Sequence, residues 1–259
     1  MTAGETTRLA LRIATCVLYS FVMFLLAWII RLATWNRPRS RYRALARATS
    51  VWGHGVARIW GMRVRVEGSP PRDPFYLVCN HISYTDIVLL CAVTPAWFVS
   101  KSEVASWPGI GPLTRTALTV FIDRETRKDV RRMNTRIADL VRDGGSVGFF
   151  PEGTTFDGTT IHPFKPSLLQ PAIELGIPVT VAAISYRTPP GSPPPEELVA
   201  WIGDDAFAPH AKRLLASPGF TATIRFAEEK VQAEDRKQLA AQAREVMLDL
   251  HRQLNGGTP

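Results

Sequence analysis

A histidine and an aspartate stand close together in the stretch Asn80–Asp86, where an apolar run ends. The run, residues 75–79, is typical of a buried strand, and polar groups that follow such a strand often form the site of an α/β fold. A carboxylate beside an imidazole fixes its tautomer and raises its basicity, so His81 and Asp86 suit a general base. Regular helix would place the two about 140° apart, so pairing requires a turn with Asp86 at or near the start of the next helix. A histidine followed five residues later by an aspartate is common by chance, so a capping or structural role for these two residues is the alternative.

A turn rich in hydrogen-bond donors follows the strand-like run 146–150. It contains Glu152, Gly153, Thr154 and Thr155. Backbone N–H groups and hydroxyls in such a turn can donate to an anion or to a developing oxyanion. A plain turn with one acidic residue at the surface is the alternative that these residues leave open.

Three cationic side chains accompany other predicted elements. Lys101 and Arg124 each follow a strand-like run, and Lys165 ends a Pro-Phe-Lys sequence that opens a predicted helix. An arginine at a strand end can hold a phosphate through two parallel hydrogen bonds. A local ion pair between Asp123 and Arg124 is the simpler alternative for that position.

The elements that must position these groups alternate between strand and helix from residue 62 onward. Strands are predicted at residues 62–66, 75–79, 96–100, 117–122, 146–150, 179–185 and 220–226, and helices at 87–91, 125–142 and 233–254. This order predicts an α/β fold: a single domain with a mixed β-sheet flanked by helices, over residues 61–259. The Pro-rich segment 189–195 is interpreted as a surface excursion.

The N-terminal residues 1–60 are predicted to be a membrane-anchoring helical region. Residues 13–30 carry no charge, and a bilayer span needs roughly 17–25 apolar residues. The arginines that follow this run predict that the rest of the chain is cytoplasmic. An interfacial helix and a buried core helix are the alternatives to a span. Residues 41–60 predict an amphipathic helix suited to the headgroup zone, although Gly53 and Gly55 weaken the prediction, and an ordinary packed helix is the alternative.

Composition and charge narrow the class of protein. The chain has 259 residues, of which 46% are hydrophobic and 21% charged, so a globular core is expected. The net charge of +8 comes from the first 66 residues, which hold eleven arginines and one acidic residue. A basic excess beside an apolar segment favours anionic lipid as a partner over nucleic acid.

Several familiar site patterns are missing from the sequence. There is no G-x-S-x-G, Walker A or G-x-G-x-x-G pattern, and no His, Cys and Asp cluster with metal-ligand spacing. The three cysteines, Cys16, Cys79 and Cys91, are interpreted as reduced thiols. The histidines other than His81 are scattered and are interpreted as structural or surface residues.

Taken in chain order, these stretches resemble the glycerolipid acyltransferase family, most of all the bacterial 1-acyl-glycerol-3-phosphate acyltransferases. The resemblance covers roughly residues 60–225. It rests on N-H-x4-D at 80–86, Lys101, F-I-D-R at 121–124, F-P-E-G-T at 150–154, P-F-K at 163–165 and Ile177-Pro178-Val179.

The resemblance implies transfer of an acyl group from acyl carrier protein or coenzyme A. The acceptor would be the sn-2 hydroxyl of 1-acyl-sn-glycerol-3-phosphate, and the product phosphatidic acid. His81 would take the hydroxyl proton and Asp86 would orient His81, with no metal and no bound cofactor. The implied substrate-binding residues are Lys101, Arg124, Glu152, Gly153, Thr154, Thr155 and Lys165. The implied location is the cytoplasmic face of the inner membrane, with membrane lipids, the lysolipid acceptor and acyl carrier protein as partners.

Two positions depart from the family pattern and leave alternatives open. Thr155 stands where the family usually has Arg, and Leu118 stands where it usually has Gly. The first departure removes a phosphate-binding cation, so lyso-ornithine lipid, which has no phosphate, is the alternative acceptor. A lipid esterase or thioesterase, with His81 activating water, is more distant, as is a catalytically silent lipid-binding module.

Overall fold

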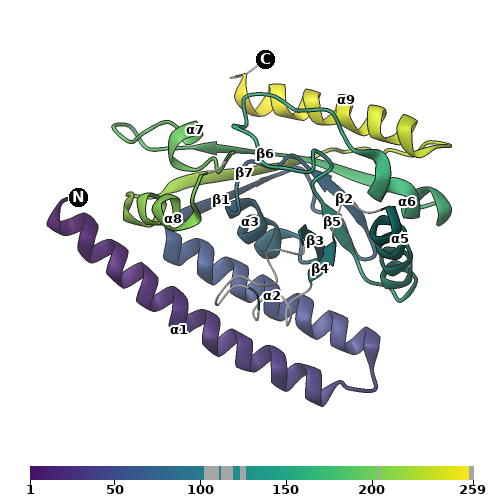
Figure 1. Cartoon of the computed structure of the whole chain (residues 1–259), viewed down its shortest axis with the longest axis horizontal. Coiled ribbons are helices and arrows are strands. Elements are labelled where there is room, and N and C mark those ends of the chain that lie inside the picture. Colours follow the sequence, from purple (N-terminus) through teal and green to yellow (C-terminus); the bar gives the residue numbers. More distant parts are fainter. Residues whose placement is uncertain (102–110, 112–118, 123–126, 204, 257–259) are drawn as a thin grey trace.

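A seven-stranded mixed β-sheet forms the centre of the protein (Figure 1). The computed structural model describes the chain except for residues 102–110, 112–118, 123–126, 204 and 257–259, and at Lys101, Ile122 and Arg127 it describes the backbone alone. The strands are β1 (Met62–Glu67), β2 (Tyr76–Cys79), β3 (Trp97–Lys101), β4 (Thr119–Ile122), β5 (Val147–Phe149), β6 (Val179–Arg187) and β7 (Phe220–Phe226). The helices are α1 (Ala3–Ala33), α2 (Pro38–Trp60), α3 (Thr85–Val93), α5 (Arg127–Arg142), the 3-10 helix η2 (Pro166–Leu169), α6 (Gln170–Glu174), α7 (Pro195–Leu198), α8 (Phe207–Ala216) and α9 (Arg236–Asn255).

The strand directions bring the predicted site residues to one edge of the sheet. The spatial order is β1-β7-β6-β2-β5-β3-β4, and the pairing is parallel except between β6 and β7. The carboxyl ends of β2 to β6 therefore lie at the same edge. β1 and β7 run the other way and end at the opposite edge. A ligand site in such a sheet is expected where the parallel strands end.

Each face of the sheet is covered by a separate layer of helices. Along β2, Leu77 and Cys79 pack with α2, α3 and α8, whereas Tyr76 and Val78 pack with α5, α6 and α9. Figure 1 shows α9 over one face and α1, α2 and α3 over the other. β2 is buried on both faces, which explains why it reads as a continuous apolar run.

The α1–α2 pair is joined to the sheet domain by close helix contacts. A Cβ on Gly53 would lie 2.5 Å from the backbone nitrogen of Ala92 in α3, and a Cβ on Gly55 would lie 2.3 Å from the ring of Tyr19 in α1. The two glycines that weaken the helix prediction for α2 are therefore the points where its neighbours approach. Each glycine lowers the stability of the helix by about 1 kcal/mol relative to Ala, and the close packing that it permits offsets this cost.

The predicted fold class is confirmed, and the predicted strands agree with the observed ones within about two residues. α3 is longer than its predicted core because it begins at Thr85 and ends at Val93. The sequence reading had no helix at α7 or α8. α7 is a four-residue turn of helix that begins at the last proline of the Pro-rich segment and is too short to show a periodicity. α8 is an amphipathic helix of ten residues.

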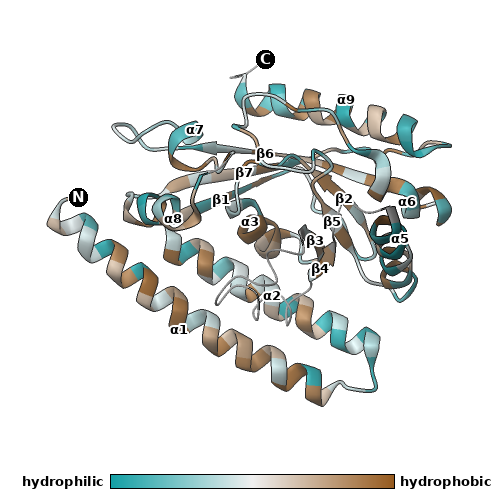
Figure 2. Cartoon of the chain, in the orientation of Figure 1, coloured by the Kyte–Doolittle hydropathy of each residue, from teal (hydrophilic) through white to brown (hydrophobic). Residues whose placement is uncertain are grey.

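α1 leaves a long apolar side exposed. It is 31 residues long, and by length and composition it is the one helix among the described residues able to cross a membrane. Figure 2 shows apolar residues along most of its length. The large apolar side chains exposed on or directly after it include Leu11, Val17, Leu18, Phe21, Val22, Leu25, Trp28, Ile29, Leu32 and Trp35. A surface of this extent is typical of a contact with lipid or with another protein.

Candidate active site

His81 and Asp86 pair through a turn between β2 and α3. His81 Nδ1 lies 2.8 Å from Asp86 Oδ2. The pair forms because α3 begins at Thr85 and places Asp86 in its first turn, as the spacing requires. The Asp86 N–H donates to the Ser83 carbonyl over 3.1 Å, which closes the turn.

The carboxylate of Asp86 is fully buried and has four hydrogen-bond donors. Oδ2 accepts from His81 Nδ1 and from the backbone N–H groups of Ile82 at 2.7 Å and Ser83 at 3.0 Å. Oδ1 accepts from the Tyr186 hydroxyl at 2.5 Å. Burial raises the pKa of Tyr186 well above its ordinary value, so this hydroxyl keeps its proton and remains a donor. Asp86 is thus fixed from β6 as well as from its own turn.

The contacts of His81 define its tautomer and the plane of its ring. Because Asp86 Oδ2 is an acceptor for two backbone N–H groups, His81 Nδ1 must carry the proton that it shares. This assignment leaves the lone pair on Nε2, the nitrogen that can take a proton from a substrate. The ring stacks on Phe150, with centroids 3.8 Å apart and planes 5° apart. The side chain of His81 is 20% exposed, so it is accessible while its orientation is fixed.

Glu152 holds the main chain of His81 from the neighbouring strand end. Its Oε2 accepts the backbone N–H of His81 at 2.7 Å, and its Oε1 accepts that of His162 at 2.9 Å. Burial raises the pKa of Glu152 to about 7, and the negative charge of Asp86 adds to the rise. The two N–H donors and the positive charge of Arg244 oppose it. Glu152 therefore titrates near neutral pH.

The loop between β5 and η2 contacts residues 81–86, the candidate catalytic turn. The Phe156 N–H donates to the His81 carbonyl over 2.9 Å. Thr154 is exposed, and the Lys165 side chain lies over Gly153, where an added Cβ would be 2.8 Å from Nζ. The Thr155 hydroxyl donates to the carbonyl of Trp201, in the segment between α7 and α8.

The predicted substrate-binding residues are brought together only in part. Glu152, Gly153, Thr154, Thr155 and Lys165 lie in the loop that contacts His81. Both oxygens of Glu152 are occupied by main-chain donors and the Thr155 hydroxyl is bound to a carbonyl, so their contacts with substrate stay predictions.

The side chains of two predicted phosphate ligands lie outside the described part of the chain. The backbone of Lys101 ends β3 at the same sheet edge as His81, but its side chain lies outside the described part of the chain. Arg124 lies wholly outside the described residues. Their role in binding stays a prediction.

Residues far along the chain complete the site, and sequence reasoning missed them. Tyr186 binds Asp86, and α9 supplies Arg244 and His251, which contact backbone carbonyls of the loop after Glu152. The available signal for Tyr186 was its place at the end of a strand beside β2. Arg244 and His251 fall in a predicted helix with no motif around them.

His210 and the cysteines have structural surroundings. His210 is buried and binds the Tyr84 hydroxyl at 3.0 Å and the Ala200 carbonyl at 2.9 Å. All three cysteines are free, and burial raises the pKa of Cys91 to about 12. Among the described residues, no group of three or more His, Cys, Asp or Glu is placed to hold a metal ion.

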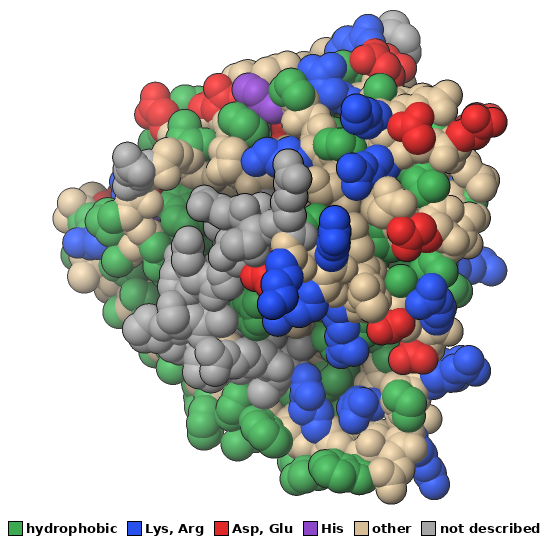
Figure 3. All heavy atoms as spheres, turned by 45° about the vertical axis from the view of Figure 1, so that its right-hand side comes forward, with side chains coloured by type: hydrophobic (Ala, Val, Ile, Leu, Met, Phe, Trp, Pro, Cys, Tyr) green, Lys and Arg blue, Asp and Glu red, His purple; other side chains and the backbone are tan. Residues whose placement is uncertain are grey.

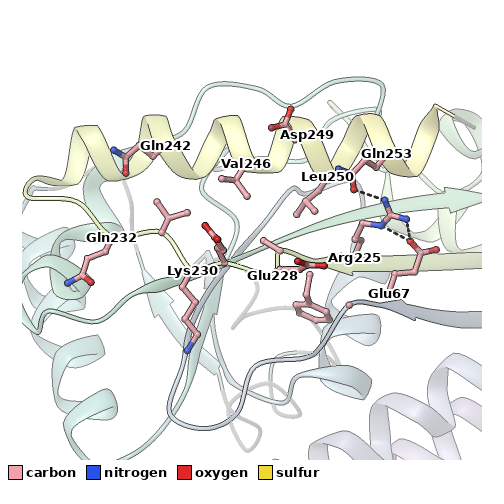
Figure 4. Close-up of a pocket in the computed structure, with 15 residues that line it drawn as sticks. Glu67, Arg225, Glu228, Lys230, Gln232, Gln242, Val246, Asp249, Leu250 and Gln253 are labelled. Atoms are coloured by element: carbon pink, nitrogen blue, oxygen red, sulfur yellow. Dashed lines mark hydrogen bonds and ion pairs between the residues drawn. The ribbon is translucent and has the colours of Figure 1, made fainter. Parts of the chain in front are cut away.

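A groove of about 1160 Å³ lies away from His81, between α9 and the ends of β1 and β7. Because β1 and β7 run against β2, their carboxyl ends lie at the sheet edge opposite the catalytic turn. Figure 4 shows charged and amide side chains around it, with Arg225 bound to Glu67 and Gln253. The groove therefore adds no group to the site at His81.

Comparison with known proteins places the catalytic turn inside a family segment. The acyltransferase family model matches residues 63–185, which include β2, α3, the Glu152 loop and most of β6. α1, α2, β7 and α9 lie outside that match.

Curated relatives and a solved structure cover more of the chain. Lyso-ornithine lipid O-acyltransferase of Pseudomonas aeruginosa is 36% identical over 230 residues, which cover 86% of this chain and 88% of the relative. The 1-acyl-sn-glycerol-3-phosphate acyltransferase of Neisseria meningitidis serogroup B is 36% identical over 151 residues, 58% of each chain. The crystal structure of the 1-acyl-sn-glycerophosphate acyltransferase PlsC from Thermotoga maritima superimposes with a TM-score of 0.68 at 20% identity, over 94% of this chain and 96% of that one. That structure shares the fold.

Proposed function

The chain belongs to the family of lysophospholipid and lyso-ornithine lipid acyltransferases, and from this premise we propose that His81 is the general base of acyl transfer to a lysolipid hydroxyl. The observation that carries the proposal is the contact between His81 Nδ1 and Asp86 Oδ2, which leaves Nε2 as the accepting nitrogen. Phe150 and Asp86 hold the ring in place before substrate arrives.

In the proposed reaction, the lysolipid hydroxyl oxygen attacks the carbonyl carbon of the acyl thioester. His81 Nε2 takes the hydroxyl proton as the new C–O bond forms. The tetrahedral intermediate then expels the thiolate, and the C–S bond breaks. The imidazolium returns its proton to the sulfur, so the products are an ester and a free thiol. The lipid hydroxyl is the nucleophile, so no acyl-enzyme is required and binding supplies proximity.

We propose lyso-ornithine lipid as the first acceptor and 1-acyl-sn-glycerol-3-phosphate as the second. The relative that aligns over most of its length is named for the former. Thr155 supports the same choice, because it stands in place of a cation and its hydroxyl is bound to Trp201. The exposed ammonium of Lys165 beside Gly153 supports an anionic headgroup, either the ornithine carboxylate or a phosphate. The second acceptor would yield phosphatidic acid.

We propose acyl carrier protein as the donor, with coenzyme A as the alternative carrier. α5 lies on the sheet face opposite α2 and α3. Its exposed side carries Lys128, Arg131, Arg132 and Arg136. Figure 3 shows Lys and Arg side chains gathered on the side of the molecule where α5 lies. A basic surface of this kind favours an acidic donor approaching from water.

We propose that the protein associates with the cytoplasmic face of the inner membrane through α1 lying in the bilayer interface. α1 is tied to the body at its start, where Arg12 donates to the carbonyls of Leu215 and Ser217 at 2.9 and 2.8 Å. Farther along, the Tyr19 hydroxyl donates to the Val51 carbonyl in α2 over 2.7 Å. Near its end, Ala27 and Ile30 pack against a cluster of α2 residues.

A bilayer span is less favourable because α2 would follow α1 into the hydrocarbon. The exposed arginines of α2 are Arg39, Arg43, Arg47 and Arg58. Each would cost about 2.5–3.5 kcal/mol at the centre of a bilayer. Fluorophores placed singly at Val17, Leu25 and Ile29 should report one shallow depth by lipid-borne quenchers. A depth that reaches the bilayer centre at Leu25 would contradict the interfacial arrangement.

A panel of acceptors and donors tests the proposed activity. Purified protein in vesicles is given a labelled acyl thioester of acyl carrier protein or of coenzyme A, together with lyso-ornithine lipid or 1-acyl-sn-glycerol-3-phosphate. The expected result is O-acylated ornithine lipid formed fastest with acyl carrier protein. Phosphatidic acid as the faster product would reverse the order of acceptors, and free fatty acid released without an acceptor would replace the transferase with an esterase or thioesterase.

A further inference from the structure

One peptide group in the loop joins α9 to the carboxylate of Glu152. The carbonyl of Ile161 and the N–H of His162 belong to this group. The carbonyl accepts a hydrogen bond from Arg244 Nη2 over 2.7 Å. The N–H donates to Glu152 Oε1 over 2.9 Å. A guanidinium and a carboxylate thus bind opposite ends of one peptide, an arrangement in which each hydrogen bond strengthens the other.

The same guanidinium and a second side chain of α9 hold the rest of the loop. Arg244 Nε donates to the His162 carbonyl over 3.2 Å, so its planar fork spans two successive carbonyls. His251, two turns farther along α9, places Nε2 2.8 Å from the Gly158 carbonyl. His251 is buried, and the side chain of Arg244 is 30% exposed. Neither residue lies in the segment that matches the acyltransferase family.

The path ends at the backbone of the catalytic histidine. Glu152 Oε2 accepts the His81 N–H over 2.7 Å while Oε1 accepts the His162 N–H. Both N–H groups need an acceptor, and a carboxylate provides one on each oxygen. A protonated carboxyl has one oxygen that carries hydrogen, so it serves one of the two N–H groups poorly.

We infer that Arg244 is a positioning residue for acyl transfer: it holds the 161–162 peptide on Glu152 and, through Glu152, the main chain of His81. The inference rests on the proposed role of His81 as the base. The hydrogen bonds of Arg244 go to residues 161 and 162 and lead through Glu152 to the main chain of His81, so we expect its removal to affect turnover more than substrate binding.

The charges around Glu152 give this inference a pH signature. Burial raises the pKa of Glu152 to about 7, and the charge of Arg244 lowers it toward the ordinary value. Loss of the guanidinium therefore raises the pKa further, and the ionised form that serves both N–H groups is reached at a higher pH. The other groups near Glu152 that carry or can carry charge are Asp86, Lys165, His81 and His162.

The test compares pH–rate profiles of Arg244→Gln, Arg244→Lys and wild-type protein with the acceptor that the panel selects. For Arg244→Gln we expect kcat to fall by about 10- to 100-fold with little change in KM. The acid half-point of the profile should move upward by about one pH unit. Arg244→Lys keeps the charge but loses the fork, so its half-point should match the wild type while kcat is only partly restored.

Two controls separate the possible outcomes. Arg252→Gln removes an exposed arginine of the same helix that pairs with Asp249 over 2.5 Å, and it should leave rate and profile unchanged. His251→Gln removes a contact with the loop but leaves the guanidinium of Arg244 in place. It should lower kcat and leave the acid half-point of the pH–rate profile unchanged. If Arg244→Gln has the acid half-point of the wild type and His81→Ala is inactive, the inference about Arg244 is wrong and the proposed function stands. An active His81→Ala overturns the proposed function instead.

Discussion

Asp86 and Glu152 are both buried carboxylates that bind the His81 turn, yet they depend on different parts of the molecule. Asp86 receives four hydrogen bonds, three of them from its own turn and one from Tyr186. Glu152 receives two, both from main-chain N–H groups, and one of these belongs to a loop that α9 holds. The catalytic pair is therefore fixed locally, whereas the support for its backbone is assembled from distant segments.

Asp86 and Glu152 are also expected to have different chemical tasks. Asp86 fixes the tautomer of the base and can stabilise the imidazolium that forms as His81 takes a proton. Glu152 has a pKa raised to about 7 by burial, so its charge changes in the range where the enzyme is expected to work. We therefore expect Asp86 to determine whether His81 can act as a base, and Glu152 to determine how the backbone of His81 responds to pH.

Replacing Asp86 should give the largest loss. In Asp86→Asn the backbone N–H groups of Ile82 and Ser83 select the amide oxygen at the position of Oδ2, so the N–H₂ group faces the Tyr186 hydroxyl. The negative charge that would stabilise the imidazolium of His81 is lost. We expect kcat to fall by about 10³- to 10⁴-fold, the loss typical of such a change in a histidine–carboxylate pair. Steady-state acyl transfer measures this, with the exposed Asp143→Asn as a control. A loss smaller than that of Glu152→Gln would break the proposed ranking of the two carboxylates.

Replacing Glu152 should have a smaller effect with a distinct pH dependence. Glu152→Gln resembles the protonated acid, because its N–H₂ group cannot accept from one of the two N–H donors. We expect kcat at pH 8 to fall about 10- to 100-fold. Because the wild-type carboxyl loses its charge as pH falls through about 7, that part of the acid limb should disappear in the variant. Full activity at pH 8 would show that the charge of Glu152 is not needed, and the exposed Glu196→Gln serves as the control.

Replacing Tyr186 should have the smallest effect. Tyr186→Phe removes one of the four donors to Asp86 and keeps the ring in the core. Three donors remain, so we expect kcat to fall only about 2- to 5-fold, in line with the net worth of one hydrogen bond. The melting temperature of the variant, measured beside its rate, reports any loss of packing. A loss as large as that of Asp86→Asn would mean that β6, and not the local turn, fixes the carboxylate.

Local patterns were enough to predict most of the sheet and the pairing of His81 with Asp86. The period-two run of β1 and the apolar run of β2 are recorded in short stretches of sequence, and so is the turn that brings Asp86 back to His81. The placement of Glu152 in the site was implied only by the family resemblance, and the structure places its carboxylate on the His81 N–H.

Contacts between distant segments were beyond such reasoning. Tyr186 reaches Asp86 from 100 residues away, and Arg244 reaches Ile161 from 83 residues away. Glu152 was expected to face the acceptor, and its burial against two main-chain N–H groups depends on the path of the loop up to His162. Gly53 weakened the prediction of a helix at α2. The reason for a glycine there is the close approach of α3, which the sequence around Gly53 does not show.

The most direct test of the account is the rate of acyl transfer by His81→Ala beside wild-type protein, under saturating donor and lysolipid. The matched control is His54→Ala, which removes an exposed histidine of α2 that binds only the Ser50 carbonyl among the contacts described. The account predicts a fall of at least about 10³-fold for His81→Ala and an unchanged rate for the control. Turnover by His81→Ala within tenfold of the wild type would contradict His81 as the base.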